Sequence, residues 1–198
     1  MELSSALARR PAGCEPDLRR PGRGFSGRLS ELGSAPVPPP SAVDHVRGPQ
    51  AADVVIEYAD FECPFCAALS VQLAERRLPR VFRHFPVRSS HPRAWPAACA
   101  AEAAALQGRF WEMHDLLFAD QARIEDPHLW ERATALGLDL ERFDSDRRSE
   151  SVRARVRRDF ESGVRAGVVT TPSLFAHGAM HAGQIESKRL DALTAGID

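Results

Sequence analysis

The sequence has few cysteines, no long apolar run and little net charge, and each shortage argues against a class of protein. Four cysteines among 198 residues are too few and too unevenly placed for a disulfide scaffold. No stretch approaches the roughly 20 apolar residues that cross a bilayer, so we expect no membrane partner or span. The formal net charge of −1 gives no electrostatic reason to expect a nucleic-acid partner.

The first residues lack the features of a secretory signal. Arg9, Arg10 and Pro11 interrupt the place where the apolar core of such a signal should run, and no apolar run follows. The sequence therefore predicts a cytoplasmic protein.

Proline and glycine are concentrated near the N-terminus. Residues 1–42 hold seven of the fifteen prolines and five glycines, and they end in the run PVPPP at 36–40, which favours extended polyproline II. We expect this segment to be a disordered or loosely packed Pro/Gly/Arg-rich extension. Residues 43–198 then form one domain of ordinary size.

Hydrophobic patterns beyond residue 53 alternate between strand and helix. The run VVIEY at 54–58 has apolar residues on both faces, as a buried central strand needs. Asp126 is expected to cap a helix that has Pro127 at its first position and ends near 136. The other predicted elements are helices at 67–77, 92–107, 110–118, 149–166 and 187–195, a short turn at 140–146, and strands at 81–85, 171–176 and 179–182.

The order of these elements predicts the fold class. Two βα units are followed by helices and then by two strands and a closing helix, which indicates an α/β sheet with a small helical layer. A helical insertion, at about 92–166, would separate the βαβ half from the C-terminal β-hairpin and helix.

The motif CPFC at residues 63–66 lies where a predicted strand gives way to a helix. Zinc sites also use this spacing, but a structural zinc needs four ligands. The histidine pair with finger-like spacing, His177 and His181, lies more than a hundred residues away, so we expect a redox pair and no metal. Of the other cysteines, Cys14 falls in the predicted extension, and Cys99 is expected to be a small buried hydrophobe.

A position at a helix N-terminus should make the first cysteine reactive. Free backbone N–H groups and the helix dipole favour an anion there, so we expect the pKa of Cys63 to fall below its usual value. Cys63 is then the exposed nucleophile, and Cys66, one turn further in, is the resolving thiol. Pro64 begins the helix without wasting a hydrogen bond, and Phe65 supplies no positive charge that would stabilise the thiolate further.

Glu57 is a carboxylate in the middle of an otherwise apolar strand, six positions before Cys63. If it is buried, its pKa should be raised, and it can accept the proton that Cys66 loses during resolution. The alternative is a glutamate at a sheet edge that faces solvent.

Six segments carry a family resemblance when they are taken in order. They are DHVRGP at 44–49, VVIEYADFECPFC at 54–66, FRHFP at 82–86, AEAA at 101–104, FWEMHD at 110–115 and GVVTTPSLF at 167–175. With these motifs the chain, over about residues 44–195, resembles the DsbA-like branch of the thioredoxin superfamily. The bacterial subgroup that it resembles also occurs as a domain attached to sodium/proton antiporters.

The resemblance implies a thioredoxin-like fold, protein-disulfide oxidoreductase activity and no organic cofactor. It also implies a cis peptide bond before Pro172, in a loop that faces the cysteine pair. Thr171 and Pro172 would bind substrate there together with Pro64 and Phe65. From the residues alone, a trans proline at the entry to a strand stays open.

The chain departs from the family pattern at two places. Thr170 precedes Thr171 where the family usually has another residue, a change expected to adjust substrate contact. The connection at 76–80 is shorter than the family's, so we expect the active-site helix to lose its last turn or to pack less well there.

Three functions remain open from the sequence. The first is a monomeric oxidoreductase that acts on protein, peptide or small-molecule thiols and disulfides, with glutathione or another thioredoxin-type protein as its recycling partner. The second is a redox-sensing binding or regulatory module without turnover. The third is a glutathione-transferase-like relative, which would not need the second cysteine.

Overall fold

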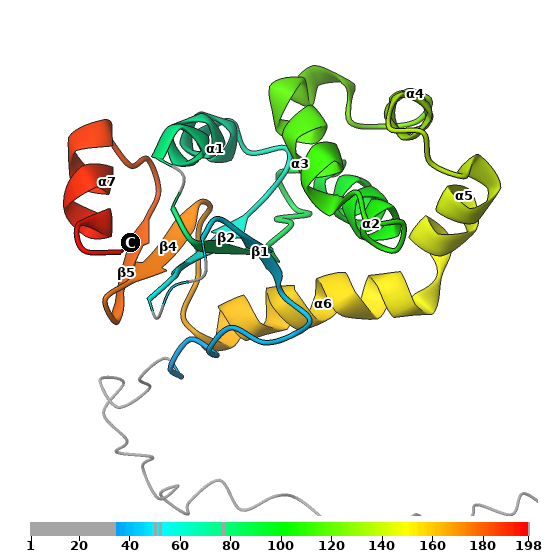
Figure 1. Ribbon diagram of the computed structural model, residues 1–198. Coiled ribbons are helices and arrows are strands. Elements are labelled where there is room, and N and C mark those ends of the chain that lie inside the picture. The colour runs from blue at the N-terminus through cyan, green and yellow to red at the C-terminus, as the bar shows by residue number, and fades with distance from the viewer. Residues whose placement is uncertain (1–34, 50, 52, 77, 198) are drawn as a thin grey trace, which may run out of the picture. The chain divides into compact units, whose positions relative to one another are not determined.

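The structure is a computed structural model that describes residues 35–49, 51, 53–76 and 78–197 (Figure 1). Its strands are β1 (His45–Arg47), β2 (Val55–Ala59), β3 (Arg80–His84), β4 (Ser173–Ala176) and β5 (Ala179–Ala182). Its α-helices are α1 (Pro64–Arg76), α2 (Ala94–Ala105), α3 (Phe110–Ala119), α4 (His128–Ala135), α5 (Leu140–Arg148), α6 (Glu150–Arg165) and α7 (Ser187–Thr194), with a 3-10 turn, η2 (Gln121–Arg123), before α4.

The strands form one mixed sheet in the order β1-β3-β2-β4-β5. β2 and β3 run parallel, and the other neighbouring pairs are antiparallel. Every residue of β2 is buried, as the two-sided apolar pattern of residues 54–58 predicted. Because β2 lies between β3 and β4, the loop that follows it leaves from the centre of the sheet.

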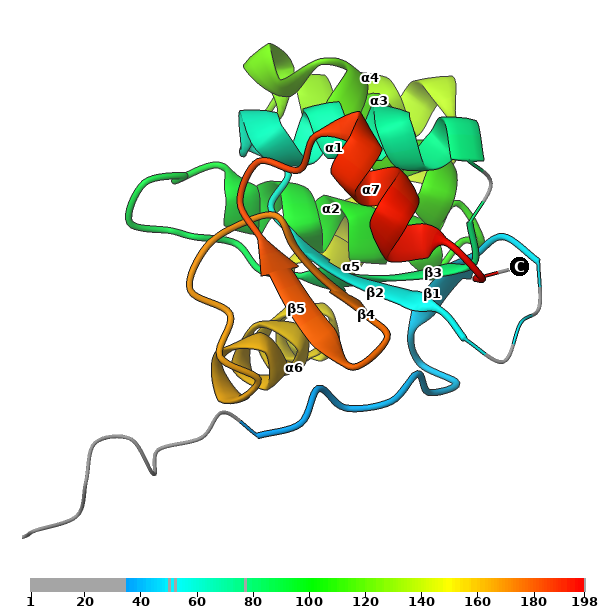
Figure 2. The ribbon, with the colours of Figure 1, turned by 90° about the vertical axis from the view of Figure 1, so that its left-hand side faces the viewer.

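Helices cover both faces of this sheet, as Figures 1 and 2 show: α1 and α7 lie on one face and α6 on the other. On the first face β2 and β4 pack against both helices through Val55, Leu69, Leu73, Leu174 and Leu190. On the second face the core contains Ile56, Tyr58, Val81 and Phe85, with Phe160 of α6 packed against them. Alternate residues of β2 thus enter two different cores.

The predicted helical insertion is observed as α2 to α6, between β3 and β4. Most of α2 is alanine and is buried, and α2 contacts α3, α5 and α6. Small side chains let helix backbones approach closely, which explains the alanine-rich run. The predicted thioredoxin-like α/β fold with its helical insertion and C-terminal hairpin and helix is confirmed.

Several local predictions are wrong in detail. Asp126 does not cap α4, because its carboxylate pairs with Arg147 at 2.8 Å and the helix begins at His128. The turn expected at 140–146 is the helix α5, capped by Asp139, whose side chain accepts from Arg142 N. The active-site helix α1 runs to Arg76, so the short connection to β3 does not remove its last turn.

The predicted N-terminal extension lies outside the described residues as far as position 34. Its described part, residues 35–42, is held against the domain. Ala35 N donates to Arg165 O at 2.8 Å, and Arg83 donates to the carbonyl oxygens of Pro38 and Pro39. Arg83 also forms a buried ion pair with Asp44 at 3.0 Å, so a buried guanidinium fixes this stretch of chain to β3.

Candidate active site

The two cysteines of the CPFC motif lie at the start of α1, directly after the loop that leaves β2. Cys66 N donates to Cys63 O at 3.1 Å, which closes the first turn of the helix. Both cysteines are free thiols. Cys66 is fully buried, and Cys63 exposes only 4% of its surface. The prediction that Cys63 is an exposed nucleophile is therefore wrong in the degree of its exposure. The neighbouring Phe65 is 47% exposed.

The surroundings of the two thiols shift their pKa values in opposite directions. The pKa of Cys63 is lowered from 9.0 to about 6, chiefly because the Cys66 thiol donates to its sulfur, with help from the backbone N–H groups of Phe65 and Cys66. The pKa of Cys66 is raised well above 9.0 by burial and by the neighbouring Cys63. A thiolate is thus favoured at the outer position and disfavoured at the inner one.

The loop before β4 approaches the outer thiol. The peptide bond between Thr171 and Pro172 is cis, and Thr171 O lies 3.4 Å from Cys63 Sγ, within reach of the thiol hydrogen. Thr171 and Pro172 are both buried, whereas Thr170 is exposed. The structure therefore brings Thr171 and Pro172 to the cysteine pair, and Pro64 and Phe65 are exposed beside it.

Glu57 is completely buried. Its strand is the central β2 and has a neighbour on each side, so the alternative of an edge or solvent-facing glutamate is excluded. Neither carboxylate oxygen has a hydrogen-bond partner among the described residues. Burial raises the pKa of Glu57, and Arg80 partly opposes that rise. The charge of Glu57 in turn contributes to the raised pKa of Cys66.

Arg80 is the residue of this site that the sequence interpretation missed. It is 1% exposed, and within the part of the chain that the structure describes none of its three side-chain nitrogens has a hydrogen-bond partner. Glu57 pairs with Phe82 in the parallel register, and Arg80 lies two positions before Phe82, on the same face of the sheet. Burial lowers the pKa of Arg80 and Glu57 raises it. A buried carboxylate requires a cation nearby, and this requirement at Glu57 is the signal that could have identified Arg80.

The loop between β2 and α1 is held by a single carboxylate. Asp60 accepts from Glu62 N at 2.7 Å and from Val87 N at 2.8 Å, and His91 Nδ1 lies 2.8 Å from its second oxygen. Asp60 N lies 3.5 Å from Cys66 Sγ. This aspartate therefore joins the inner cysteine to the segment that follows β3.

One group among the described residues has the composition of a metal site, and it does not include the cysteines. Glu102 Oε1 lies 2.7 Å from His45 Nε2 and 2.7 Å from His84 Nε2. Hydrogen bonds from the two imidazoles to the shared carboxylate account for this arrangement. Arg155 Nε, at 3.8 Å from the same oxygen, brings a further positive charge to the place where a cation would have to lie. His177 and His181, considered from the sequence, belong to the β4–β5 hairpin.

The site thus consists of an outer thiol with a lowered pKa and a buried inner thiol, at the start of the first helix after the central strand β2. A family model described as thioredoxin matches residues 41–195. The chain therefore belongs to the thioredoxin family. Among helices of the described residues, none is long and apolar enough to cross a membrane.

Solved structures of similar fold are oxidoreductases of the DsbA-like kind. A thioredoxin-like oxidoreductase from Silicibacter pomeroyi DSS-3 superposes with a TM-score of 0.70 at 24% identity, covering 78% of this chain and 91% of its own. The thiol-disulfide exchange protein alpha-DsbA2 from Wolbachia pipientis gives 0.69 at 15% identity, covering 77% and 86%. At these identities the likeness establishes the fold.

Sequence relatives with higher identity bear transporter names. The Na(+)/H(+) antiporter NhaA 1 of Mycolicibacterium gilvum is 45% identical over 163 residues, which are 77% of this chain and 26% of the relative. The Na(+)/H(+) antiporter NhaA 3 of Salinispora tropica is 41% identical over 160 residues, 78% of this chain and 24% of its own. The chain thus spans about a quarter of these relatives, in agreement with the antiporter-attached subgroup that the motifs resemble.

Proposed function

We propose that the protein is a thiol–disulfide oxidoreductase that acts on protein or small-thiol substrates through Cys63 and Cys66. The observation that carries the proposal is the geometry of the site: two thiols lie at the start of α1, and the loop with the cis Thr171–Pro172 bond brings Thr171 O to 3.4 Å from Cys63 Sγ. The opposite pKa shifts, to about 6 for Cys63 and well above 9.0 for Cys66, agree with this geometry. Near neutral pH, Cys63 is largely a thiolate and can attack. Cys66 holds its proton until a base removes it.

In the reductive direction the Cys63 thiolate attacks one sulfur of a substrate disulfide. The substrate S–S bond breaks, a bond between Cys63 and that sulfur forms, and the leaving thiolate takes a proton from water. Cys66 then gives its proton to Glu57 and attacks the Cys63 sulfur. The Cys63–Cys66 disulfide forms and the second substrate thiolate leaves, so two electrons have passed from the protein to the substrate. The oxidative direction is the reverse.

Glu57 and Arg80 supply the proton acceptor in this scheme. A carboxylate whose pKa is raised by burial is a better base for a thiol than an exposed one. Without the nearby guanidinium, burial would keep the carboxylate protonated and unable to accept. Arg80 is therefore a positioning residue that acts through Glu57, and it does not touch the reacting sulfurs.

The proposed partners follow from the loop that contacts Cys63. Backbone groups at Thr171, which follows the exposed Val169 and Thr170, suit pairing with an extended polypeptide, and the exposed Pro64 and Phe65 offer apolar contact. We propose a monomer that is returned to its starting redox state by glutathione or by another thioredoxin-type protein.

Catalytic turnover tests the function. We expect the purified protein to reduce insulin or to oxidise a dithiol peptide over many cycles, and we expect Cys63→Ser to abolish this activity. Cys99→Ala is the matched control, because Cys99 is also buried but belongs to α2. A mixed disulfide that forms without turnover would favour the redox-sensing module. Full activity in Cys66→Ser would favour the glutathione-transferase-like alternative.

A further inference from the structure

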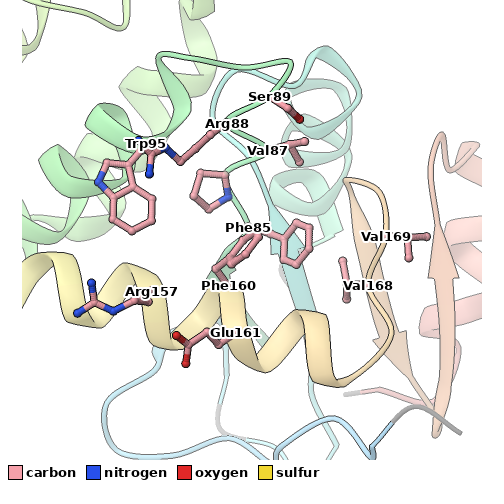
Figure 3. Close-up of a pocket in the computed structure, with 11 residues that line it drawn as sticks. Phe85, Val87, Arg88, Ser89, Trp95, Arg157, Phe160, Glu161, Val168 and Val169 are labelled. Carbon is pink, nitrogen blue, oxygen red and sulfur yellow. The ribbon is translucent and has the colours of Figure 1, made fainter. Parts of the chain in front are cut away.

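An apolar pocket opens on the α6 face of the sheet, beside the loop that contacts Cys63 (Figure 3). Its volume is about 750 Å³. Phe85 and Phe160 lie in its centre, with Trp95 near one end and Val168 and Val169 near the other (Figure 3). A cavity of this size with a largely apolar lining is typical of a ligand site.

Both sides of the pocket are joined to the redox site by short connections. On one side, Val87 N donates to Asp60 at 2.8 Å, and Asp60 N lies 3.5 Å from Cys66 Sγ. On the other side, Val169 stands two residues before Thr171, whose carbonyl oxygen lies 3.4 Å from Cys63 Sγ. Short stretches of backbone therefore connect the pocket lining to the contacts of both cysteines.

The floor of the pocket is preformed, because closely packed groups hold it in place without a ligand. The Phe85 and Phe160 rings lie with their centroids 4.7 Å apart and their planes tilted by 31°. Gly163 on α6 brings the helix so close to β3 that an added Cβ would lie 2.7 Å from the Phe85 ring. A preformed apolar floor reduces the ordering cost of binding.

The rim favours an apolar side chain over a small anion. Val169, at the end near Thr171, is 85% exposed, an unusual position for a valine in a folded chain. The charged residues that line the pocket have both signs, Arg88 and Arg157 against Glu161. Arg157 also pairs with Glu150, outside the pocket, at 2.6 Å, and the Arg88 guanidinium lies 5.3 Å from the centre of the Trp95 ring. This mixture offers no concentrated positive field for an anionic thiol.

We infer that this pocket is a subsite for an apolar side chain of a polypeptide substrate, two residues from the cysteine that bonds to Cys63. The inference rests on the proposed function and narrows its substrate class to extended, apolar polypeptides. If the substrate cysteine pairs opposite Thr171, the period of two along a strand places its second neighbour opposite Val169, about 7 Å away along the strand. That neighbour is directed to the same face as the cysteine and reaches the mouth of the pocket.

Two disulfide-bonded peptides that differ in one residue test the subsite. One has phenylalanine two positions from the attacked cysteine, on the side that antiparallel pairing places at Val169, and the other has serine there. We expect kcat/KM to be about tenfold higher for the phenylalanine peptide, which is less than the full burial of such a side chain would give.

A matched pair of variants locates the preference. Val169→Asp should bring the ratio of the two kcat/KM values close to one. Val71→Asp should keep the wild-type ratio, because Val71 is a 62% exposed valine on α1 and does not line the pocket. Equal rates for the two peptides in the wild-type protein, or an unchanged ratio in Val169→Asp, would overturn the subsite alone. Failure to exchange with either peptide and with a small aromatic disulfide would overturn the proposed function itself.

A second measurement observes the pocket directly. Each peptide is trapped as a mixed disulfide on Cys63 in the Cys66→Ser protein, and the indole N–H signals are recorded by NMR. The Trp95 signal should shift with the phenylalanine peptide relative to the serine peptide, while the Trp130 signal, from a ring that packs near Phe143, should not. Identical spectra for the two trapped peptides would contradict the subsite.

Discussion

The lowered pKa of Cys63 has a consequence for stability that denaturation measures. A thiol whose pKa is lower in the folded state stabilises that state above the unfolded pKa, and the contribution disappears as pH falls through the folded pKa. The fall from 9.0 to about 6 corresponds to about 4 kcal/mol once both states are ionised. At about pH 7.5 the folded thiol is ionised and the unfolded one is not, so the contribution there is about 2 kcal/mol.

The Cys63→Ser protein lacks this contribution and serves as the reference. The reduced wild-type protein should gain about 2 kcal/mol in unfolding free energy over Cys63→Ser when the pH is raised from about 5 to about 7.5. Other titrating groups are common to the two proteins, and Cys66 stays protonated throughout because burial raises its pKa. Urea unfolding of both proteins at both pH values gives the difference in unfolding free energy between them at each pH.

The ultraviolet absorbance of the thiolate gives a second, independent measurement of the Cys63 pKa. It should titrate with a midpoint near the pKa of about 6 in the wild-type and Cys99→Ala proteins and vanish in Cys63→Ser. If the stability difference between wild type and Cys63→Ser is the same at both pH values, then Cys63 is not an acidic thiol and the reasoning from its environment fails.

Three more predictions concern other parts of the molecule. Glu57→Gln should slow resolution of a Cys63 mixed disulfide by about 100-fold and leave the alkylation rate of Cys63 nearly unchanged; equal slowing of both steps would argue against a proton acceptor. Gly163→Ala should lower the unfolding free energy by about 1–3 kcal/mol, because its Cβ would meet the Phe85 and Tyr58 rings; an unchanged urea midpoint would refute this. Asp44→Asn should cost about 3–5 kcal/mol, since it leaves Arg83 buried without its anion, and calorimetry would reveal the loss.

The parts of the fold that were predictable have strong local patterns. Each of three such patterns can be recognised within a few consecutive residues: the apolar run of β2, the alanine-rich run of α2 and the CPFC motif. The strand β1 was missed because it has three residues, too few for any period to show. Its existence depends on pairing with β3, which the chain reaches more than thirty residues later.

Buried charges were the least predictable feature of the site. Glu57 stands out in an apolar strand, but Arg80 was assigned to a connection because arginines surround it in the sequence. Arg155 belongs to a strongly charged helix, yet its side chain is 12% exposed and lies 3.8 Å from Glu102 of α2. The carboxylates that act on Arg80 and Arg155, Glu57 and Glu102, belong to elements distant in sequence, and no local pattern records such partners. The cytoplasmic location and the monomeric state stay predictions.

The near-complete covering of Cys63 separates two properties that are often equated, acidity and accessibility. A sulfur that is ionised near neutral pH, but belongs to a residue with 4% of its surface exposed, admits attack along a narrow approach. Compact electrophiles reach it, and bulky ones are excluded whatever their intrinsic reactivity. For the proposed oxidoreductase this covering would select substrates by shape: an exposed, extended segment would bring its disulfide to Cys63, whereas a disulfide recessed within a folded protein would not reach it.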